Sequence, residues 1–165
     1  MKTILNWRKA TFRTVYEIYA YNTQIGKLKE KQWSQSAEGE LNGHRYSFIS
    51  KGTFKCRTRI IDSANHKVIG NISYNTWMTK ATINYSDRLI QWKYNNTWNT
   101  KWSMYDHEGT KLCYRGTSSK GQIESDVDDD MLILTGLYIA NYNWQVTTIA
   151  VIMAVIIPII ATALH

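Results

Sequence analysis

The sequence lacks the features that mark an exported, disulfide-stabilised or disordered chain. Its two cysteines, Cys56 and Cys113, lie far apart without a CxxC motif, so we expect two reduced thiols rather than a disulfide or a metal site. Only one proline occurs, and 44% of the residues are hydrophobic, which excludes a disordered chain. The N-terminus has two or three apolar residues where a secretory signal needs a run of about 7 to 15, so we expect no export.

Motifs for catalysis are missing as well. No HxxxH, GxSxG, P-loop or GxGxxG sequence occurs. His44, His66 and His107 fall at expected turns of different hairpins, as solvated turn histidines do. We therefore expect no enzyme activity and no cofactor. The sequons at Asn71 and its two counterparts, Asn84 and Asn95, are expected to be unused in a chain without an export signal.

Charge is absent from the C-terminal stretch between Met131 and Leu164. As one helix this stretch would be roughly 50 Å long, well beyond the roughly 30 Å hydrocarbon core of a bilayer. We interpret it as two segments joined where polar and amphipathic residues 141–145 interrupt it. The first, 131–140, is too short to span lipid and is expected inside protein; the second, from about 146 to 164, is long enough to span. A continuous helix from Tyr138 to Leu164 is an alternative that the sequence leaves open.

This division predicts one domain over residues 1–144, with a core helix over about 128–144, and a transmembrane anchor over 145–165. We expect Tyr142 and Trp144 at headgroup level, where aromatic rings with one polar edge are favoured. The residues expected to face the core from the helix are Met131, Leu132, Leu134, Leu137 and Tyr138.

Period-two alternation, typical of strands with one buried face, runs through the body of the chain. In residues 54–60, one face carries Phe54, Cys56, Thr58 and Ile60, and the other carries basic residues. Residues 77–84 and 90–94 repeat the pattern, with Trp77 expected to face inward. Asn42-Gly43 is the strongest turn signal, because a type I′ hairpin needs positive φ at both central positions. The pattern predicts about twelve strands, over residues 3–9, 12–20, 24–31, 36–41, 44–50, 54–61, 66–74, 77–85, 88–94, 99–105, 110–115 and 119–125.

A faint repeat relates Gly26 to Gly70, 44 positions apart, and each unit would hold about four strands. The alternative is that all hairpins look alike.

Closure of the sheet into a barrel would explain why the first half of the C-terminal stretch is apolar on all sides. A barrel of eight strands is filled by its own side chains, so twelve strands would leave a hole that something apolar on all sides must fill. Residues 131–140 are the candidate, and Gly136 and Ala140 would let a strand approach them. The aspartates at 128–130 would cap this helix; a metal site is the weaker interpretation of the same run. The fold class is therefore mainly β: a closed antiparallel barrel around a C-terminal helix, followed by a transmembrane tail.

The net charge of +7 comes from a basic body, since every Lys and Arg lies in the first 120 residues. With a membrane tail on the same chain, the expected partner is an anionic membrane surface rather than nucleic acid. RNA binding is disfavoured because the alternation pattern places most aromatic rings in the core, where they cannot stack on bases. The residues expected on the outward basic face are Lys55, Arg57, Arg59, Lys80 and Lys93.

These patterns together resemble the superfamily of tubby C-terminal domains, LURP-one-related proteins and phospholipid scramblases. The resemblance rests on the strand-turn-strand units ending in Ile25-Gly26-Lys27 and Val68-Ile69-Gly70, and on the acidic-then-leucine-rich stretch Asp128 to Ile139. It implies a lipid-facing, non-catalytic domain attached to a membrane. The calcium loop of scramblases and the Lys/Arg pocket of tubby domains have no counterpart here, so neither calcium nor phosphoinositide binding is transferred.

The resulting hypothesis is a tail-anchored, non-catalytic membrane protein whose basic barrel, on the cytosolic side, binds or organises the membrane surface. The alternatives are an accessory subunit of a larger membrane complex, with Ala150 and Ala154 making helix contacts, or scramblase-like lipid translocation.

Overall fold

The computed structural model of the chain describes residues 2–11, 13–31, 34–51 and 57–163. It contains twelve strands and one helix, α1, over Asp130–Ala163. The strands are β1 (Thr3–Lys9), β2 (Val15–Ala20), β3 (Thr23–Glu30), β4 (Ala37–Leu41), β5 (His44–Lys51), β6 (Arg57–Asp62), β7 (Lys67–Tyr74), β8 (Lys80–Tyr85), β9 (Arg88–Tyr94), β10 (Lys101–Tyr105), β11 (Lys111–Gly116) and β12 (Lys120–Ser125).

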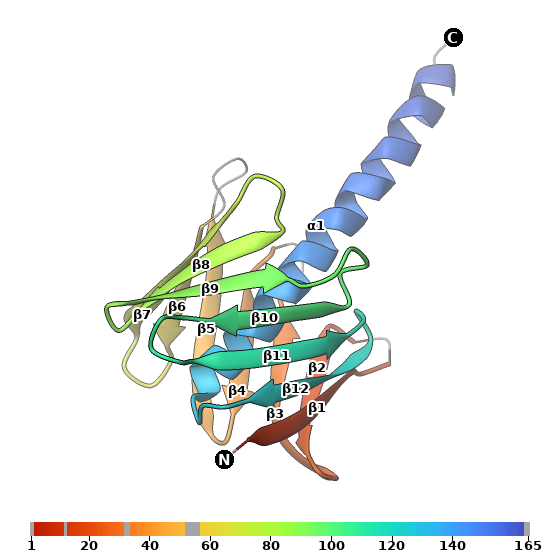
Figure 1. Ribbon diagram of the computed structural model, residues 1–165. Coiled ribbons are helices and arrows are strands. Elements are labelled where there is room, and N and C mark those ends of the chain that lie inside the picture. The colour runs from red at the N-terminus through yellow and green to blue at the C-terminus, as the bar shows by residue number, and fades with distance from the viewer. Residues whose placement is uncertain (1, 12, 32–33, 52–56, 164–165) are drawn as a thin grey trace.

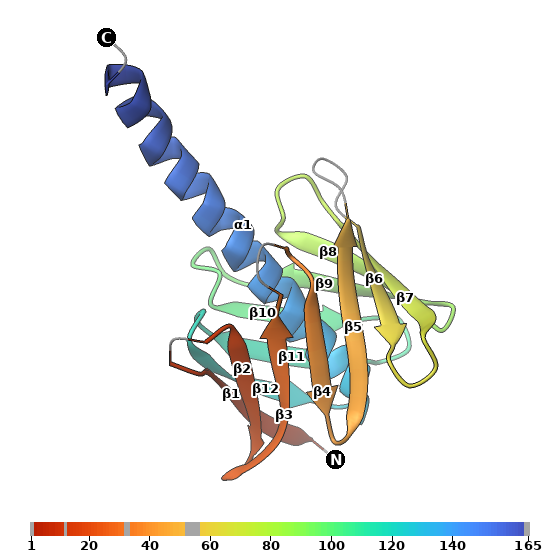
Figure 2. The ribbon, with the colours of Figure 1, turned by 180° about the vertical axis from the view of Figure 1, so that it is seen from behind.

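The strands form a closed antiparallel barrel in which each strand pairs with its sequence neighbours. β1 closes the barrel by pairing with β12, in the register Leu5 to Ile123 and Trp7 to Gly121. Helix α1 runs through the barrel and leaves it at one end (Figures 1 and 2). The predicted fold class is therefore confirmed.

The alternation in sequence corresponds to the two faces of the barrel wall. On β6, Thr58 and Ile60 are buried whereas Arg57 and Arg59 are exposed. The prediction that Trp77 faces inward is wrong: its side chain is 83% exposed, because β8 begins only at Lys80 and Trp77 belongs to the preceding loop.

The repeat predicted from Gly26 and Gly70 is confirmed as a structural repeat. Each glycine lies beside a shift of register, in β2–β3 and in β6–β7 respectively. The next hairpin of each unit turns with positive φ at two positions, Asn42-Gly43 in the first unit and Ser86-Asp87 in the second, again 44 residues apart. The type I′ turn expected at Asn42-Gly43 is thereby confirmed.

Helix α1 begins with the cap expected from the aspartates. The Asp129 carboxylate accepts a hydrogen bond from the backbone N–H of Leu132, with 3.0 Å between Oδ1 and N. Asp130 accepts from the Asn42 amide at 2.7 Å, and its other oxygen lies 2.6 Å from His44 Nδ1. The turn between β4 and β5 therefore fixes the start of α1 at one end of the barrel.

The first thirteen residues after Asp130 fill the barrel, and all of them are buried. Phe48 stacks on Tyr138 at 4.5 Å between ring centroids, and Trp102 stacks on Tyr114 at 5.5 Å. The backbone carbonyl of Gly136 accepts hydrogen bonds from the indole N–H groups of Trp92 and Trp102, at 3.2 and 3.1 Å. The predicted core residues Met131, Leu132, Leu134, Leu137 and Tyr138 are all buried, as expected.

The same helix continues without a break beyond the barrel, so the continuous alternative is the one observed. An 18-residue window of α1 has a mean hydropathy of 2.5, and none of that window is buried. Its length and composition allow this exposed half to cross a membrane.

The prediction that Tyr142 lies at headgroup level is wrong. Its side chain is 2% exposed and stacks on Tyr74 inside the barrel, with 4.6 Å between ring centroids. The amides around it did not mark the end of the buried segment. The barrel wall supplies a polar partner for the first of them, since Tyr16 donates to Asn141 Oδ1 at 3.1 Å. Trp144 is half-buried where the helix leaves the barrel.

Candidate functional site at the barrel mouth

The two ends of the barrel differ in chemistry. We call the end where α1 begins the base; its turns are 21–22, 42–43, 63–66, 86–87 and 106–110. We call the end where α1 leaves the mouth; its described loops include 75–79, 95–100 and 117–119, which lie around residues 143–148 of the helix.

Acidic and basic residues are separated along the barrel axis. Every aspartate of the chain lies at the base: Asp62, Asp87, Asp106, Asp126, Asp128, Asp129 and Asp130. The strand residues that border the mouth loops are cationic at six positions: Lys9, Lys51, Arg57, Lys80, Lys101 and Lys120. Among the described residues at these borders the one acid is Glu30, which is buried and paired with Lys9. The mouth therefore carries positive charge and the base negative charge.

The structure brings some of the predicted basic residues to the mouth. Arg57 and Lys80 begin β6 and β8 there, and Lys93 lies directly opposite Lys80 on β9. Arg59 is exposed on the same wall, two residues further from the mouth, and Lys55 lies outside the described residues.

Three pairs of like charges face each other across neighbouring strands at the mouth. The pairs are Lys51 with Arg57, Lys80 with Lys93, and Lys101 with Arg115. Like charges in this position destabilise a sheet, and none of the six forms an ion pair within the described part of the chain. An anion from outside would relieve this repulsion.

Two mouth loops share a sequence and a structure that the alternation pattern did not reveal. Residues 75–80 read Asn-Thr-Trp-Met-Thr-Lys and residues 96–101 read Asn-Thr-Trp-Asn-Thr-Lys. In each, the Asn side-chain oxygen accepts from the backbone N–H groups of the Thr and Lys four and five residues later, at 2.9 to 3.0 Å, and its amide donates to the hydroxyl of that same Thr. The fourth residue of each has positive φ, 56° at Met78 and 55° at Asn99.

These two loops hold large apolar side chains in solvent. Trp77 is 83% exposed and Trp98 is 84% exposed, although the loops that carry them are fixed by three side-chain hydrogen bonds each. Exposed tryptophans beside an apolar helix are typical of a contact with a membrane interface. The repeated hexapeptide is the signal in the sequence that would have identified them.

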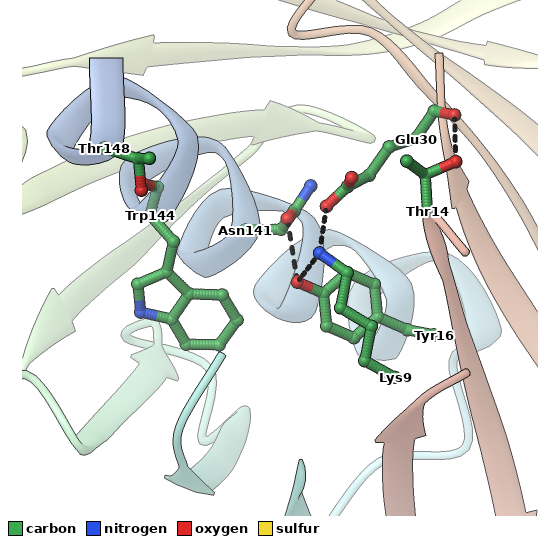
Figure 3. A network of polar contacts seen from close by, with 7 residues as sticks. All are labelled: Lys9, Thr14, Tyr16, Glu30, Asn141, Trp144 and Thr148. Atoms are coloured by element: carbon green, nitrogen blue, oxygen red, sulfur yellow. Dashed lines mark hydrogen bonds and ion pairs between the residues drawn. The ribbon is translucent and has the colours of Figure 1, made fainter. Parts of the chain in front are cut away.

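A polar network joins α1 to the wall just inside the mouth (Figure 3). Lys9 Nζ lies 3.3 Å from Glu30 Oε1 and donates to the Tyr16 hydroxyl at 3.3 Å, and that hydroxyl donates to Asn141. Burial raises the pKa of Tyr16, and the negative charge of Glu30 raises it further, so the hydroxyl stays protonated as a donor. The network ties strands β1, β2 and β3 to the helix at the point where it leaves.

A hollow of about 410 Å³ opens at the mouth, between the two tryptophan loops and α1. Its lining includes Trp77, Trp98, Trp144, Tyr94 and Asn143. Asn143 is 4% exposed, and neither its amide nitrogen nor its oxygen forms a hydrogen bond of standard geometry within the described structure, although its side chain lies within reach of the Tyr94 hydroxyl. Burial raises the pKa of Tyr94 to about 12, and a hydrogen-bonding contact with the Asn143 side chain acts in the opposite direction.

The described residues hold no group of three His, Cys, Asp or Glu side chains that could bind a metal ion. His44 contacts the start of α1, whereas His66 and His107 are exposed at turns of the base. Cys113 is a free, half-buried thiol on β11, and Cys56 lies outside the described residues.

Comparison with known proteins adds no relative. No family model, no curated protein and no solved structure matches this chain. The class that fold and site define is a twelve-stranded β-barrel filled by the first part of an apolar helix whose second part is exposed.

Proposed function

We propose that this protein is a membrane-anchored, non-catalytic β-barrel whose mouth lies against an anionic lipid surface, which it binds or organises. The exposed half of α1 would be the anchor. The observation that carries the proposal is the pair of rigid Asn-Thr-Trp-x-Thr-Lys loops, which present Trp77 and Trp98 beside that helix.

Charge supports the same orientation. Each Lys or Arg near an anionic leaflet contributes on the order of 1 kcal/mol of attraction, and the mouth carries several without an acidic partner. The aspartates at the base would be held away from the surface, which avoids repulsion. The barrel wall around a C-terminal helix also supports membership of the tubby, LURP-one-related and scramblase superfamily, as part of this proposal.

The anchor is tested by fractionation of the full-length protein. We expect it in the membrane fraction after an alkaline carbonate wash. Replacing Ile152 and Ile156 together by Lys should release it, because each Lys at the centre of a span costs roughly 2.5 to 3.5 kcal/mol. Recovery of the unmodified protein in the soluble fraction without detergent would refute the anchor.

The contact of the mouth is tested by hydrogen–deuterium exchange on the full-length protein in nanodiscs. We expect loops 75–79 and 95–100 to exchange more slowly in discs that contain phosphatidylglycerol than in discs of phosphatidylcholine alone. Salt should reduce the difference, since screening weakens the attraction of exposed charges. Lys80→Gln with Lys101→Gln should reduce it too, whereas Lys67→Gln, at the base, is the matched control. Equal exchange in the two kinds of disc would argue against a charged contact.

An accessory subunit is the second candidate, favoured by the exposure of large apolar side chains around the outer half of α1. Purification in mild detergent distinguishes the two: a stoichiometric partner protein indicates a subunit, and its absence together with lipid-dependent protection of the mouth indicates a surface-binding module.

A further inference from the structure

The hollow at the mouth differs from the surrounding surface because it is lined without a charged side chain. The lining consists of aromatic rings, Met78, Asn143 and several hydroxyl-bearing or amide residues. A ligand with a net negative charge would find no cation inside the hollow. The hollow therefore selects a different kind of ligand from the basic surface around it.

Asn143 supplies hydrogen-bonding capacity that the protein uses only in part, through its contact with Tyr94. An amide buried to this degree normally has partners, because leaving its donor and acceptor unpaired costs free energy. Asn143 lines the hollow, and beyond its contact with Tyr94 it keeps one N–H of Nδ2 and its Oδ1 unpaired, so a ligand there would receive a hydrogen bond from Nδ2 and donate one to Oδ1.

The aromatic rings favour a positively charged part of the same ligand. Trp77, Trp98, Trp144 and Tyr94 all line the hollow, and aromatic faces attract ammonium groups, tryptophan most strongly. Lys80 and Lys101 follow directly after lining residues Thr79 and Thr100, so a negative group at the edge of the hollow would be near two cations.

We propose that the hollow between Trp77, Trp98 and Asn143 binds the zwitterionic headgroup of one phospholipid. The ammonium group lies against the rings and the Asn143 oxygen, and the phosphate accepts from the Asn143 amide at the side of Lys80 and Lys101. The volume suits a headgroup, since it lies at the small end of the roughly 300 to 1,000 Å³ of ligand sites. This inference rests on the proposed membrane contact of the mouth, and adds one specific lipid to it.

The test is a titration of the full-length protein in a maltoside detergent with dihexanoyl phospholipids, followed by tryptophan fluorescence. We expect saturable binding of the ethanolamine and choline lipids. Raising the salt to about 0.5 M, which shortens the screening length roughly twofold relative to physiological salt, should leave this binding nearly unchanged. Tighter binding of the ethanolamine lipid supports a hydrogen bond to Asn143 Oδ1, and equal binding supports recognition by the rings alone.

Two variants at the hollow should weaken binding of both zwitterionic lipids by about tenfold: Asn143→Leu, which removes the amide, and Trp98→Ala, which removes a ring. Trp98 is exposed, so its replacement leaves the fold intact and keeps the test valid if Asn143→Leu unfolds the barrel. Tyr21→Ala, which removes a 95% exposed ring at the base, is the matched control and should have no effect.

Preferential binding of phosphatidylglycerol, or zwitterionic binding that neither variant weakens, would overturn this site. Neither result would affect the anchor, which fractionation tests separately. Conversely, loss of phosphatidylglycerol-dependent protection in the nanodisc experiment would refute the charged contact and leave this titration unchanged.

Discussion

Asp129 performs two opposing roles at the start of α1. Its carboxylate caps the helix through Leu132, but burial disfavours the charged form and raises the pKa of Asp129 above its ordinary value of 3.8. In the folded protein the group therefore holds its proton to a higher pH than in the unfolded chain. The charge destabilises the fold increasingly as pH rises through the folded pKa, and this effect is absent below about 3.8.

Replacing Asp129 separates these roles. Asp129→Asn keeps the side-chain oxygen that caps the helix and removes the charge, so we expect a higher free energy of unfolding at pH 7 and no difference at pH 3. Asp129→Ala removes both the cap and the charge, so it should cost about 1 kcal/mol at pH 3 and less than that at pH 7, where relief of the buried charge offsets part of the lost cap. Thermal unfolding in detergent at the two pH values measures both. A destabilising Asn variant at pH 7 would show that attraction to the helix N-terminus outweighs burial.

Residue-scale reasoning from the sequence failed where a polar or aromatic side chain has an unusual position. The amides of Asn141 and Asn143 resemble the end of a buried segment, because an apolar helix usually becomes polar where it leaves its surroundings. Here a buried wall residue, Tyr16, provides a partner for Asn141, a contact 125 residues apart in sequence that no local pattern contains. Trp77 fitted the pattern of inward-facing residues, but β8 begins only at Lys80, so Trp77 lies in a loop and not on the inner face of the barrel.

At the scale of elements, most of the fold could be predicted. Eleven of the twelve hairpin and closure contacts join sequence neighbours, so local alternation and turn residues nearly determine the topology. The remaining contact, β1 with β12, follows from the need to enclose the apolar helix. The sequence could not predict how far the buried part of α1 extends. Residues 141–143 are more polar than the apolar run before them, yet they are buried inside the barrel as well.

The fit between helix and wall depends on Gly136. A Cβ added there would lie 2.2 Å from the Tyr114 hydroxyl oxygen and 2.3 Å from Cζ of the same ring. Tyr114 cannot move freely, because it stacks on Trp102 and its hydroxyl is directed at the carbonyls of Leu132 and Ile133.

We therefore expect Gly136→Ala to lower the free energy of unfolding by about 1 to 3 kcal/mol, the usual cost of overpacking. Gly39→Ala, on β4, is the control: its added Cβ would meet the Leu134 and Phe48 side chains at 3.1 to 3.3 Å, and the end of a leucine can shift. Chemical unfolding of both variants in detergent gives the comparison. Equal losses would mean that the Tyr114 contact is not limiting.

At the scale of the whole molecule, the axial separation of charge and the position of the helix support the proposed orientation, with the mouth toward the membrane. Three sequons, at Asn71, Asn84 and Asn95, allow a test of the predicted cytosolic location of the barrel. All three are exposed, on the wall or at the mouth. On the cytosolic side they stay unmodified, because glycosylation takes place in the lumen.

Translation of the full-length chain with endoplasmic reticulum microsomes tests this orientation. We expect one membrane-associated species whose mobility does not change with endoglycosidase. A sequon fused beyond His165, on a short extension, is the positive control and should be modified. Modification at the barrel sequons would reverse the orientation and place the basic mouth against the opposite leaflet.

Residues 131–143, which fill the barrel, follow all twelve strands in the sequence, and this order constrains how the barrel folds. Until residues 131–143 are available, the inner faces of all twelve strands have nothing to cover them, and β1 must wait for β12 before the wall can close. Long-range pairing of this kind is slow and leaves apolar surface open to aggregation. Since the exposed half of α1 follows residues 131–143 in the same helix, the segment that completes the barrel and the proposed membrane anchor leave the ribosome one directly after the other.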